Sequence, residues 1–371
     1  MKIQNGAPSW ARRGLHVLLA ILIVATILPL VAADAWWVRV LEFPRVQIVV
    51  IMVAVMAGLV FFGGRTSRFW LLAGAVAAIY QVVRIFPYTP LYPVQAVTVD
   101  ACPAEQSMQI LVVNVLQDNR DFARTVALVK DEAPDVFLAL ETDRPWVEAL
   151  TAIHDAYPNR RLVPLDNTYG LAFYSRLSVH ALDERYVVEP DVPSIRATLG
   201  LPSGDAFDLY ALHPRPPLPG KDSGPRDAEL VLTGREAGDS ERPVIVAGDL
   251  NDVAWSNTTK LFQEIGGLLD PRIGRGYYSS YNAKLPGVRW PLDHVFFSDS
   301  FALIDFRTLD PVGSDHFPIS ATLCLKPQME LVQDEPRPDL DAFEDAADQL
   351  DEGMEQQRDE MASGEDEVLT P

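Results

Sequence analysis

Cysteine is scarce in this chain of 371 residues, which holds only Cys102 and Cys324. Neither residue lies in a Cys-x-x-Cys pair or a Cys/His cluster, so the sequence lacks the ligand spacing of a zinc site. Basic residues are also few, 31 against 51 acidic ones. They form no evident patch of the kind that grips nucleic acid. These deficits disfavour a zinc-finger protein and a protein that binds nucleic acid mainly through its charge.

The acidity is concentrated at the C-terminus. Residues 329–371 contain 16 of the acidic residues but only Arg337 and Arg358 of the basic ones. A segment with this much charge and few aromatic residues cannot bury enough apolar surface to fold by itself. A weak helix over residues 339–360 is the alternative, but the charge favours disorder. We therefore expect residues 327–371 to be an acidic disordered tail, and the net charge of −20 says little about partners.

Three long apolar stretches occupy the N-terminal region, at residues 15–33, 46–62 and 69–83. The first is long enough to span a bilayer, and the other two approach the roughly 17–25 residues that a spanning helix needs. The alternative is a cleaved signal peptide followed by buried core helices, but the first stretch is longer than the apolar core of a signal peptide. We expect residues 1–90 to form a membrane domain with three transmembrane helices in contact with the lipid bilayer.

Positive charge is distributed unevenly around these stretches. The side of the N-terminus carries five basic residues and the other side three: Lys2, Arg12, Arg13, Arg65 and Arg68 against Arg39, Arg45 and Arg84. By the positive-inside rule the N-terminus lies in the cytoplasm. Three crossings then place the rest of the chain on the extracytoplasmic side, after a proline-containing linker at residues 91–106.

Residues 107–326 alternate between strand and helix patterns. Continuous apolar runs typical of buried strands include "MQILVVNV" (108–115), "VFLALE" (136–141), "PVIVAGDLN" (243–251) and "FPISATLCL" (317–325). Helical spacing appears between them, for example at residues 224–238. This mixture predicts one α/β domain built as a sandwich of two sheets.

Polar side chains recur where these strands begin or end. The set contains only carboxylates, amides and imidazoles: Asn114, Glu141, His213, Asp249, Asn251, Asp293, Asp315 and His316. Oxygen ligands of this type suit a hard divalent cation, and imidazoles beside carboxylates can transfer protons. Taken singly, each residue has a structural alternative as a helix cap, a turn former or a surface residue. Together they favour metal-assisted hydrolysis of a phosphoester.

The motifs around these residues resemble the endonuclease/exonuclease/phosphatase superfamily, typified by pancreatic deoxyribonuclease. The resemblance rests on "NV" (114–115), "LALE" (138–141), "LHPRPP" (212–217), "GDLND" (248–252), "LDHVF" (292–296) and "GSDHFPI" (313–319), in the order of the family. It implies a four-layer α/β/β/α sandwich over residues 107–326. The three N-terminal stretches, "RGYYSSYN" and "RWPLDHVF" are similar to a bacterial membrane-anchored branch, which implies a multi-pass protein of the bacterial inner membrane.

The resemblance also implies a metal site. Glu141 is the expected main ligand of Mg²⁺ or Mn²⁺, with Asn114 and Asp315 beside it.

The catalytic roles follow from the same resemblance. Asp249 would orient or deprotonate the attacking water, and Asn251 would hold a phosphate oxygen. His316, paired with Asp293, would lie next to the scissile phosphorus, and either His316 or Asp249 could be the general base. His213 would bind a phosphate oxygen or protonate the leaving group.

One covalent link is also implied. The family pairs its first and last strands antiparallel, which brings Cys102, before the first strand, close to Cys324, near the end of the last. We expect a disulfide between them.

The resulting prediction is a membrane-anchored, metal-dependent phosphoesterase acting on phosphodiesters. Two alternatives differ in the substrate. The protein is either a nuclease acting on DNA or RNA, or a phosphodiesterase acting on phospholipids or sugar phosphates. Nucleic acid stays open as a substrate, although no basic patch supports it. A third alternative is a catalytically silent membrane scaffold, which the eight polar positions argue against.

Overall fold

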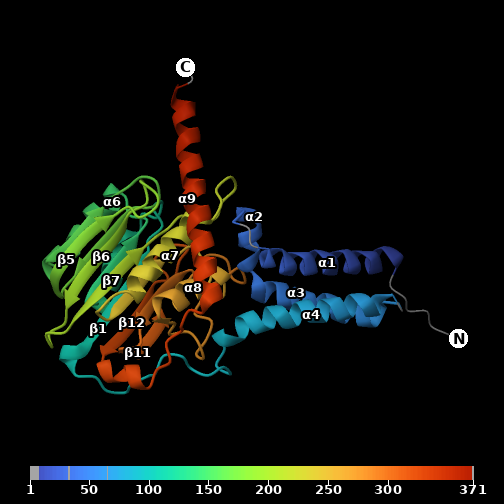
Figure 1. Cartoon of the computed structure of the whole chain (residues 1–371), viewed down its shortest axis with the longest axis horizontal. Coiled ribbons are helices and arrows are strands. Elements are labelled where there is room, and N and C mark those ends of the chain that lie inside the picture. The colour runs from blue at the N-terminus through green and yellow to red at the C-terminus, as the bar shows by residue number, and fades with distance from the viewer. Residues whose placement is uncertain (1–7, 32–33, 65, 370–371) are drawn as a thin grey trace.

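The computed structural model describes residues 8–31, 34–64 and 66–369. Figure 1 shows an α/β domain with a bundle of helices projecting from one side. Within these described residues, the strands form two mixed sheets of six strands each. In spatial order, the first sheet contains β11 (Phe301–Thr308), β12 (Ile319–Leu325), β1 (Ser107–Asn114), β2 (Val136–Leu140), β4 (Leu171–Ser175) and β3 (Asn159–Val163).

The second sheet has the same number of strands. In spatial order it contains β5 (Ser178–Arg185), β6 (Ser194–Gly200), β7 (Ala206–Leu212), β8 (Val244–Asp249), β10 (Asp293–Ser298) and β9 (Leu268–Leu269). Each sheet has one parallel pair at its centre, β1 with β2 and β7 with β8. The carboxyl ends of those four strands therefore supply adjacent positions for functional side chains.

The main core lies between the two sheets. Alternate residues of each strand face it, as the period of two requires: Ile110 and Val112 of β1 share one apolar cluster with Leu209 and Ile245 of the other sheet. The intervening residues of β1, such as Val113, pack instead on the outer side of their sheet. Strands that are buried on both faces explain why their sequences are continuous apolar runs.

Helices cover both outer faces of the sandwich. The first sheet is covered by α5 (Phe122–Glu132) and α6 (Arg144–Ala149), and the second by α7 (Gly224–Gly238) and α8 (Asn257–Gly266). Side-chain caps fix two of the starts, since Asp143 accepts a hydrogen bond from the Trp146 N–H and Ser256 from the Thr259 N–H. The predicted four-layer α/β/β/α sandwich is thus confirmed.

Three helices of the N-terminal region are long and apolar enough to cross a membrane, judged over the described residues alone. They are α1 (Ser9–Ile27), α3 (Arg45–Phe62) and α4 (Ser67–Ile85), with the short α2 (Trp36–Arg39) between the first two. Gly74 allows them to pack closely, because Leu19 and Met56 approach its Cα face. Lys2, Arg65 and residues 32–33, used in the sequence analysis, lie outside the described residues.

Short 3₁₀ helices connect several of these elements. Their bounds are Leu28–Leu30, Val40–Glu42, Phe86–Tyr88, Ala104–Gln106, Leu150–Ala156 and Pro327–Leu331.

The C-terminal segment differs from the expectation of a disordered tail. Residues Leu340–Leu369 form the helix α9, which runs across α7 and α8 and extends beyond the domain (Figure 1). Its Ala342 and Ala346 are buried against Val231 and Ile265. The stripe of small residues is short, so composition alone misses it, but it lets α9 pack on an existing surface rather than fold by itself.

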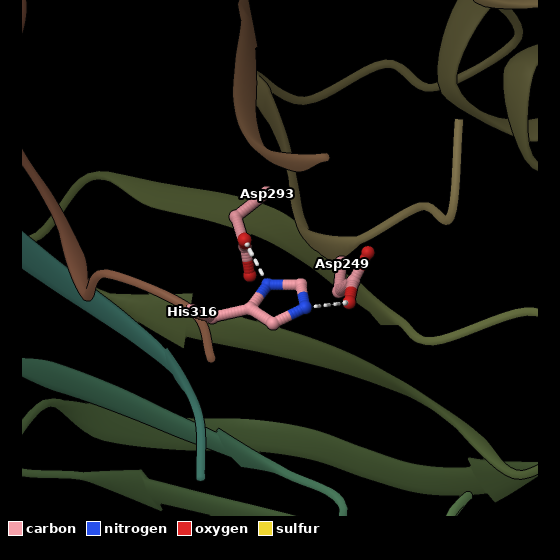
Figure 2. Close-up of side chains that lie close together, drawn as sticks. All are labelled: Asp249, Asp293 and His316. Carbon is pink, nitrogen blue, oxygen red and sulfur yellow. Dashed lines mark hydrogen bonds and ion pairs between the residues drawn. The ribbon is translucent and has the colours of Figure 1, made fainter. Parts of the chain in front are cut away.

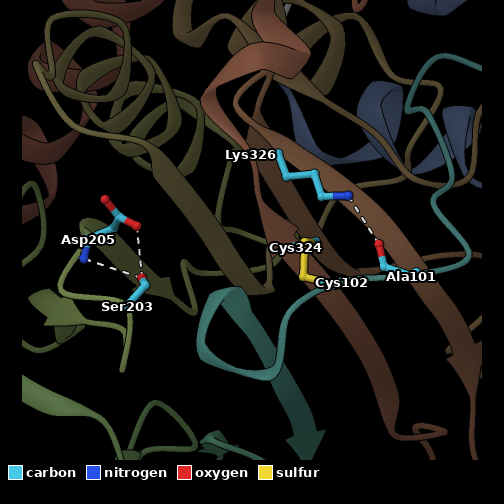
Figure 3. Close-up of a disulfide and its surroundings, with 6 residues drawn as sticks. All are labelled: Ala101, Cys102, Ser203, Asp205, Cys324 and Lys326. Carbon is cyan, nitrogen blue, oxygen red and sulfur yellow. Dashed lines mark hydrogen bonds between the residues drawn. A yellow bond between two sulfur atoms is a disulfide. The ribbon is translucent and has the colours of Figure 1, made fainter.

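The predicted disulfide is present. Cys102 and Cys324 are bonded with their Cα atoms 5.9 Å apart (Figure 3). The register of β1 and β12 explains the pairing, because Ser107 at the start of β1 lies opposite Cys324. The bond closes a sequence separation of 222 residues, and it links the segment before the first strand of the domain to the last strand.

Removing this disulfide should destabilise the α/β domain. We expect the double variant Cys102→Ser/Cys324→Ser to lose about 2–5 kcal/mol of unfolding free energy, because the long loop is no longer closed in the unfolded chain. Urea unfolding of the full chain in detergent, followed by near-UV circular dichroism, measures the change. Reductant should lower the wild-type midpoint and leave the double variant unaffected. Two reactive thiols in native, unreduced wild-type protein would contradict the assignment.

A buried carboxyl group lies on the inner side of α7. Glu229 is 1% exposed, and its Oε1 has no hydrogen-bond partner among the described residues. Burial, reinforced by the charge of Glu189, raises the pKa of Glu229 from 4.5 to about 8.

The stability of the protein should therefore fall as the pH rises from about 4.5 to about 8. Over this interval an unfolded chain ionises Glu229 and the folded one does not, so the unfolded state gains stability. Glu229→Gln should reduce this dependence of the unfolding free energy on pH. The difference in unfolding free energy between the variant and wild type should therefore be more favourable to the variant at pH 8 than at pH 5. Urea unfolding at several pH values checks this, with Glu105→Gln, an exposed glutamate, as the matched control. Parallel pH profiles for wild type and Glu229→Gln would refute it.

Candidate active site

The first sheet brings two of the predicted residues to one edge of the sandwich. Asn114 is the last residue of β1, and Glu141 directly follows β2. The two strands are parallel, with Asn114 opposite Leu140. Glu141 adopts a left-handed backbone conformation, with φ of 62°. This conformation is uncommon for a residue other than glycine and is typical of functional turns.

The second sheet brings three more residues to the same edge. His213 directly follows β7, Asp249 ends β8, and Asp293 begins β10. Asp293 and Asp249 are paired in the antiparallel register of β10 and β8. Their carboxylates therefore start from adjacent backbone positions, which is unfavourable unless a positive group lies between them.

Gly248 allows β7 and β8 to approach each other at this point. Its φ is +149°, and a Cβ there would lie 1.9 Å from the carbonyl oxygen of Leu212. No side chain fits such a space, so glycine is required immediately before Asp249. In the "GD" of the "GDLND" motif, the backbone therefore requires the glycine, and the aspartate supplies a carboxylate to the site.

Asn114 connects the two sheets through its side-chain amide. Its Nδ2 donates to Glu141 Oε1 at 2.8 Å and to Asp249 Oδ2 at 3.0 Å. Its Oδ1 accepts a hydrogen bond from the Leu116 N–H at 3.0 Å. Two carboxylates from different sheets therefore converge on one small polar group.

The imidazole of His316 lies between the carboxylates of Asp249 and Asp293 (Figure 2). Its Nδ1 is 2.7 Å from Asp293 Oδ2, and its Nε2 is 3.6 Å from Asp249 Oδ2. Burial alone would lower the pKa of His316, but the charges of Asp293 and Asp249 outweigh it and raise the pKa to about 10. His316 is therefore an imidazolium at neutral pH, and it offsets the repulsion between the two carboxylates.

Asp249 and His213 have pKa values shifted in opposite directions. Burial, with the charge of Asp293, raises the pKa of Asp249 to about 6. Burial lowers the pKa of His213, and the nearby charge of His316 adds to this effect. His213 Nε2 lies 3.9 Å from Asp249 Oδ2, and its Nδ1 has no hydrogen-bond partner in the described part of the chain. Groups poised in this way are common at functional sites.

The remaining two predicted residues lie at the margin of this group. Asn251 donates its side-chain N–H to the carbonyl of Pro214 at 2.9 Å, and its backbone N–H to Asp249 Oδ1 at 2.9 Å. Asp315 is half-buried in the turn before β12, and its charge is among those that raise the pKa of Glu141, after the effect of burial. Among the described residues, neither side chain is hydrogen-bonded to Glu141.

Three of these residues form a group that could hold a metal ion. One ligand atom from each of Asp249, Asp293 and His316 lies within 4.8 Å of the others. In this geometry, however, both imidazole nitrogens face carboxylates, and a protonated imidazole cannot coordinate a cation. Glu141 and Asp249, which converge on Asn114, offer a second arrangement of oxygen ligands.

Sequence reasoning missed a buried arginine behind the site. Arg226 in α7 donates to the backbone carbonyl of Asn251 at 2.8 Å and is ion-paired with Asp227. Asp227 is in turn 3.3 Å from Arg39, which lies in α2. This network connects the segment between the apolar helices to the loop that follows Asp249. No local motif marks Arg226, because it lies in an ordinary helical pattern.

His294 and Arg272 form a supporting pair beneath Asp293. Arg272 donates to His294 Nδ1 at 2.6 Å, and His294 Nε2 lies 2.9 Å from the carbonyl oxygen of Asp252. His294 is fully buried and, as the next residue of β10 after Asp293, lies on the opposite face of the strand.

The sequence matches the profile of the Endonuclease/Exonuclease/phosphatase family over residues 111–316. The chain belongs to this family. The matched region begins in β1 and ends at His316, so it contains all eight of the predicted site residues. A search of curated protein sequences found no match.

Several solved structures are similar to the catalytic domain of this family member. A humanized D. rerio TDP2 with 14 mutations is 16% identical, with 59% of this chain and 99% of that chain covered and a TM-score of 0.49. The human Nocturnin catalytic domain with bound sulfate is 14% identical, with 61% and 96% covered and a TM-score of 0.49. An endonuclease/exonuclease/phosphatase family protein from Leptotrichia buccalis C-1013-b is 17% identical, with 58% and 99% covered and a TM-score of 0.46. Similarities at this level carry no argument about substrate.

Replacing Asp293 should lower the pKa of His316 towards the ordinary value of a histidine. In Asp293→Asn the nearest negative charge and its hydrogen bond to the imidazolium are lost, so the pKa of His316 should fall from about 10 by at least one unit. NMR of the protein labelled with ¹⁵N-histidine, recorded across pH, measures the change. Asp305→Asn, at an exposed carboxylate, is the control and should leave the titration unchanged. If the two variants titrate alike, Asp293 does not set the charge of His316.

Proposed function

We propose that this protein is a membrane-anchored, divalent-metal-dependent phosphoesterase that hydrolyses phosphodiesters with water. The observation that carries the proposal is the environment of Asp249, whose Oδ2 faces Asn114, His316 and His213. Carboxylates, an imidazolium and a neutral imidazole around one point are the groups needed to activate water and to bind a phosphate.

The residues present fit a hard divalent cation. Glu141 and Asp249 direct oxygens at a single amide group. Burial raises the pKa of Glu141 more than its hydrogen bonds and the charge of His316 lower it, so a bound cation would stabilise this carboxylate. We propose that Glu141, Asn114 and Asp315 hold Mg²⁺ or Mn²⁺. Such an ion would neutralise the carboxylates and polarise a phosphate oxygen.

The protein's own groups would then divide the proton transfers. Asp249, with a pKa of about 6, is suited to accept the proton of the attacking water near neutral pH. His316, held as an imidazolium by Asp293, would donate a proton to the leaving oxygen. Asp249 and His316 are 3.6 Å apart, so they can exchange the proton after each turnover. We therefore propose Asp249 as the base and His316 as the acid.

His213 and Asn251 would bind the phosphate. His213 is neutral because its burial lowers its pKa, and it has an unused ring nitrogen that can contact a phosphate oxygen. Asn251 is held next to Asp249 by its own backbone N–H. Positioning the phosphorus in line with the water contributes to the rate by lowering the entropic cost.

Membrane anchoring forms the second part of the proposal. We propose that α1, α3 and α4 cross a bacterial inner membrane and that the catalytic domain lies outside the cytoplasm. Large apolar side chains on the outer surface of the helices support this, including Phe61 at 78% and Phe69 at 73% exposure. The disulfide supports export, since such bonds persist in oxidising compartments.

The charges at the two ends of the helices support the same orientation. Arg39 and Arg45, on the side of the catalytic domain, are paired with buried carboxylates. Arg12, Arg13 and Arg68, at the opposite end, are exposed. The arginines exposed to solvent therefore lie at the end of the helices that the positive-inside rule assigns to the cytoplasm.

Catalysis can be tested on water-soluble esters. We expect the full chain in detergent to hydrolyse bis(p-nitrophenyl) phosphate with Mg²⁺ and to stop when EDTA is added. Glu141→Gln and His316→Ala should each reduce the rate by roughly 10²-fold or more. His180→Ala, an exposed histidine on β5, is the matched control and should retain full activity. A folded protein with no metal-dependent turnover across phosphomonoesters and diesters would favour a silent scaffold instead.

A further inference from the structure

The loop between Tyr281 and Trp290 contacts the first turn of the apolar helix α3. Gln47, the third residue of α3, donates its side-chain N–H to the carbonyl of Gly287 at 3.0 Å and to that of Arg289 at 3.4 Å. The candidate membrane span begins at Arg45. If α3 crosses a bilayer, residues 287–289 lie at the boundary between headgroups and hydrocarbon.

This loop exposes apolar side chains flanked by cations. Leu285 is 54% exposed and Val288 42%, and the exposed Lys284 and the half-buried Arg289 lie on either side. In water, exposed leucine and valine on one short loop have no stabilising partner. At a bilayer surface the apolar side chains can enter the interface while the cations contact anionic headgroups.

The same loop contacts the catalytic residues. The Ala283 N–H donates to the backbone carbonyl of Asp315 at 2.7 Å. Tyr281 packs on His316, with ring centroids 5.0 Å apart, and on Trp290, with ring centroids 5.7 Å apart. Trp290 packs on Phe43, which precedes α3, at 6.0 Å. A continuous row of aromatic rings therefore runs from the helical bundle to the imidazole of the site.

From these contacts we infer that the substrate is a phospholipid in the same bilayer, which residues 282–289 (the interfacial loop) admit to the site. The inference rests on the proposed phosphoesterase function and specifies its substrate class. Oxygen from water bonds to phosphorus, and the bond from phosphorus to one ester oxygen breaks. The proton of the water passes to Asp249, the leaving oxygen takes one from His316, and the products are a phosphomonoester and an alcohol. No oxidant or second substrate is needed.

The experiment compares three substrates on the full chain reconstituted in nanodiscs of equal parts phosphatidylglycerol, phosphatidylethanolamine and phosphatidylcholine. They are the nanodisc lipids themselves, dihexanoyl phosphatidylglycerol free in solution, and bis(p-nitrophenyl) phosphate, with lipid products measured by mass spectrometry. We expect wild type to cleave nanodisc lipid faster than the short-chain lipid, which has the same headgroup but is not presented by a bilayer.

Variants of the interfacial loop separate lipid access from chemistry. Leu285→Asp and Val288→Asp should each lower hydrolysis of nanodisc lipid about tenfold or more, and hydrolysis of bis(p-nitrophenyl) phosphate less than about twofold. Leu285→Trp, which keeps an interfacial side chain, should retain lipid hydrolysis. Ala181→Asp adds the same charge on β5, the edge strand far from the apolar helices in Figure 1, and should change neither activity.

The outcomes distinguish the two proposals. No hydrolysis of any ester, including bis(p-nitrophenyl) phosphate, would overturn the proposed function. Metal-dependent hydrolysis of bis(p-nitrophenyl) phosphate without hydrolysis of nanodisc lipid would overturn only the lipid inference. Faster cleavage of a single-stranded oligonucleotide than of lipid would also overturn it, in favour of a nuclease. Equal losses on lipid and soluble diester in Leu285→Asp would show that the loop has a purely structural role.

The depth of the interfacial loop can be measured without activity. Both natural cysteines are in the disulfide, so Leu285→Cys introduces the one thiol that reacts with a nitrobenzoxadiazole dye. In nanodiscs its emission should shift to the blue and be quenched by doxyl-labelled lipid. Ala181→Cys should instead be quenched by aqueous iodide. If the dye at residue 285 behaves like the one at residue 181, the loop does not meet the bilayer.

Discussion

The carboxylate of Asp249, buried where the two sheets meet, is the constraint on which the rest of the site depends. A charge removed from water is costly unless other groups replace its hydration. Asn114 from the opposite sheet, the Asn251 N–H and the imidazolium of His316 supply those contacts. Because these partners come from both sheets, the polar site and the packing of the sandwich stabilise the same arrangement.

Much of the site could be predicted from the sequence because its residues lie at the ends of strongly apolar strands. Asn114, Glu141 and Asp249 are recognisable once the runs before them are interpreted as strands, and parallel pairing brings such ends together. The contact between Asp293 and His316 required the family resemblance, since 23 residues separate them and no local pattern links them. The disulfide depended on the same resemblance.

Other features depend on tertiary contacts that composition does not encode. The charge of α9 predicts disorder, yet a few alanines are enough for it to dock on α7 and α8. No sequence pattern marks Arg226, which in the fold is buried and bonded to the carbonyl of Asn251. The position of residues 287–289 beside α3 follows from Gln47, a residue that looks unremarkable in an apolar stretch. In each case a distant partner decides the outcome.

The catalytic domain is joined to the helical bundle by more than its linker. Trp255 donates its indole N–H to the carbonyl of Glu42 and accepts a bond from Arg84, while the Ser223 N–H bonds to the carbonyl of Asp34. A domain on a flexible tether explores a volume set by the length of that tether. This one cannot tilt or swing freely, so with its helices in a bilayer it would keep one height and one face towards the lipid. For a substrate in the same bilayer, the search would then be two-dimensional and limited by lateral diffusion.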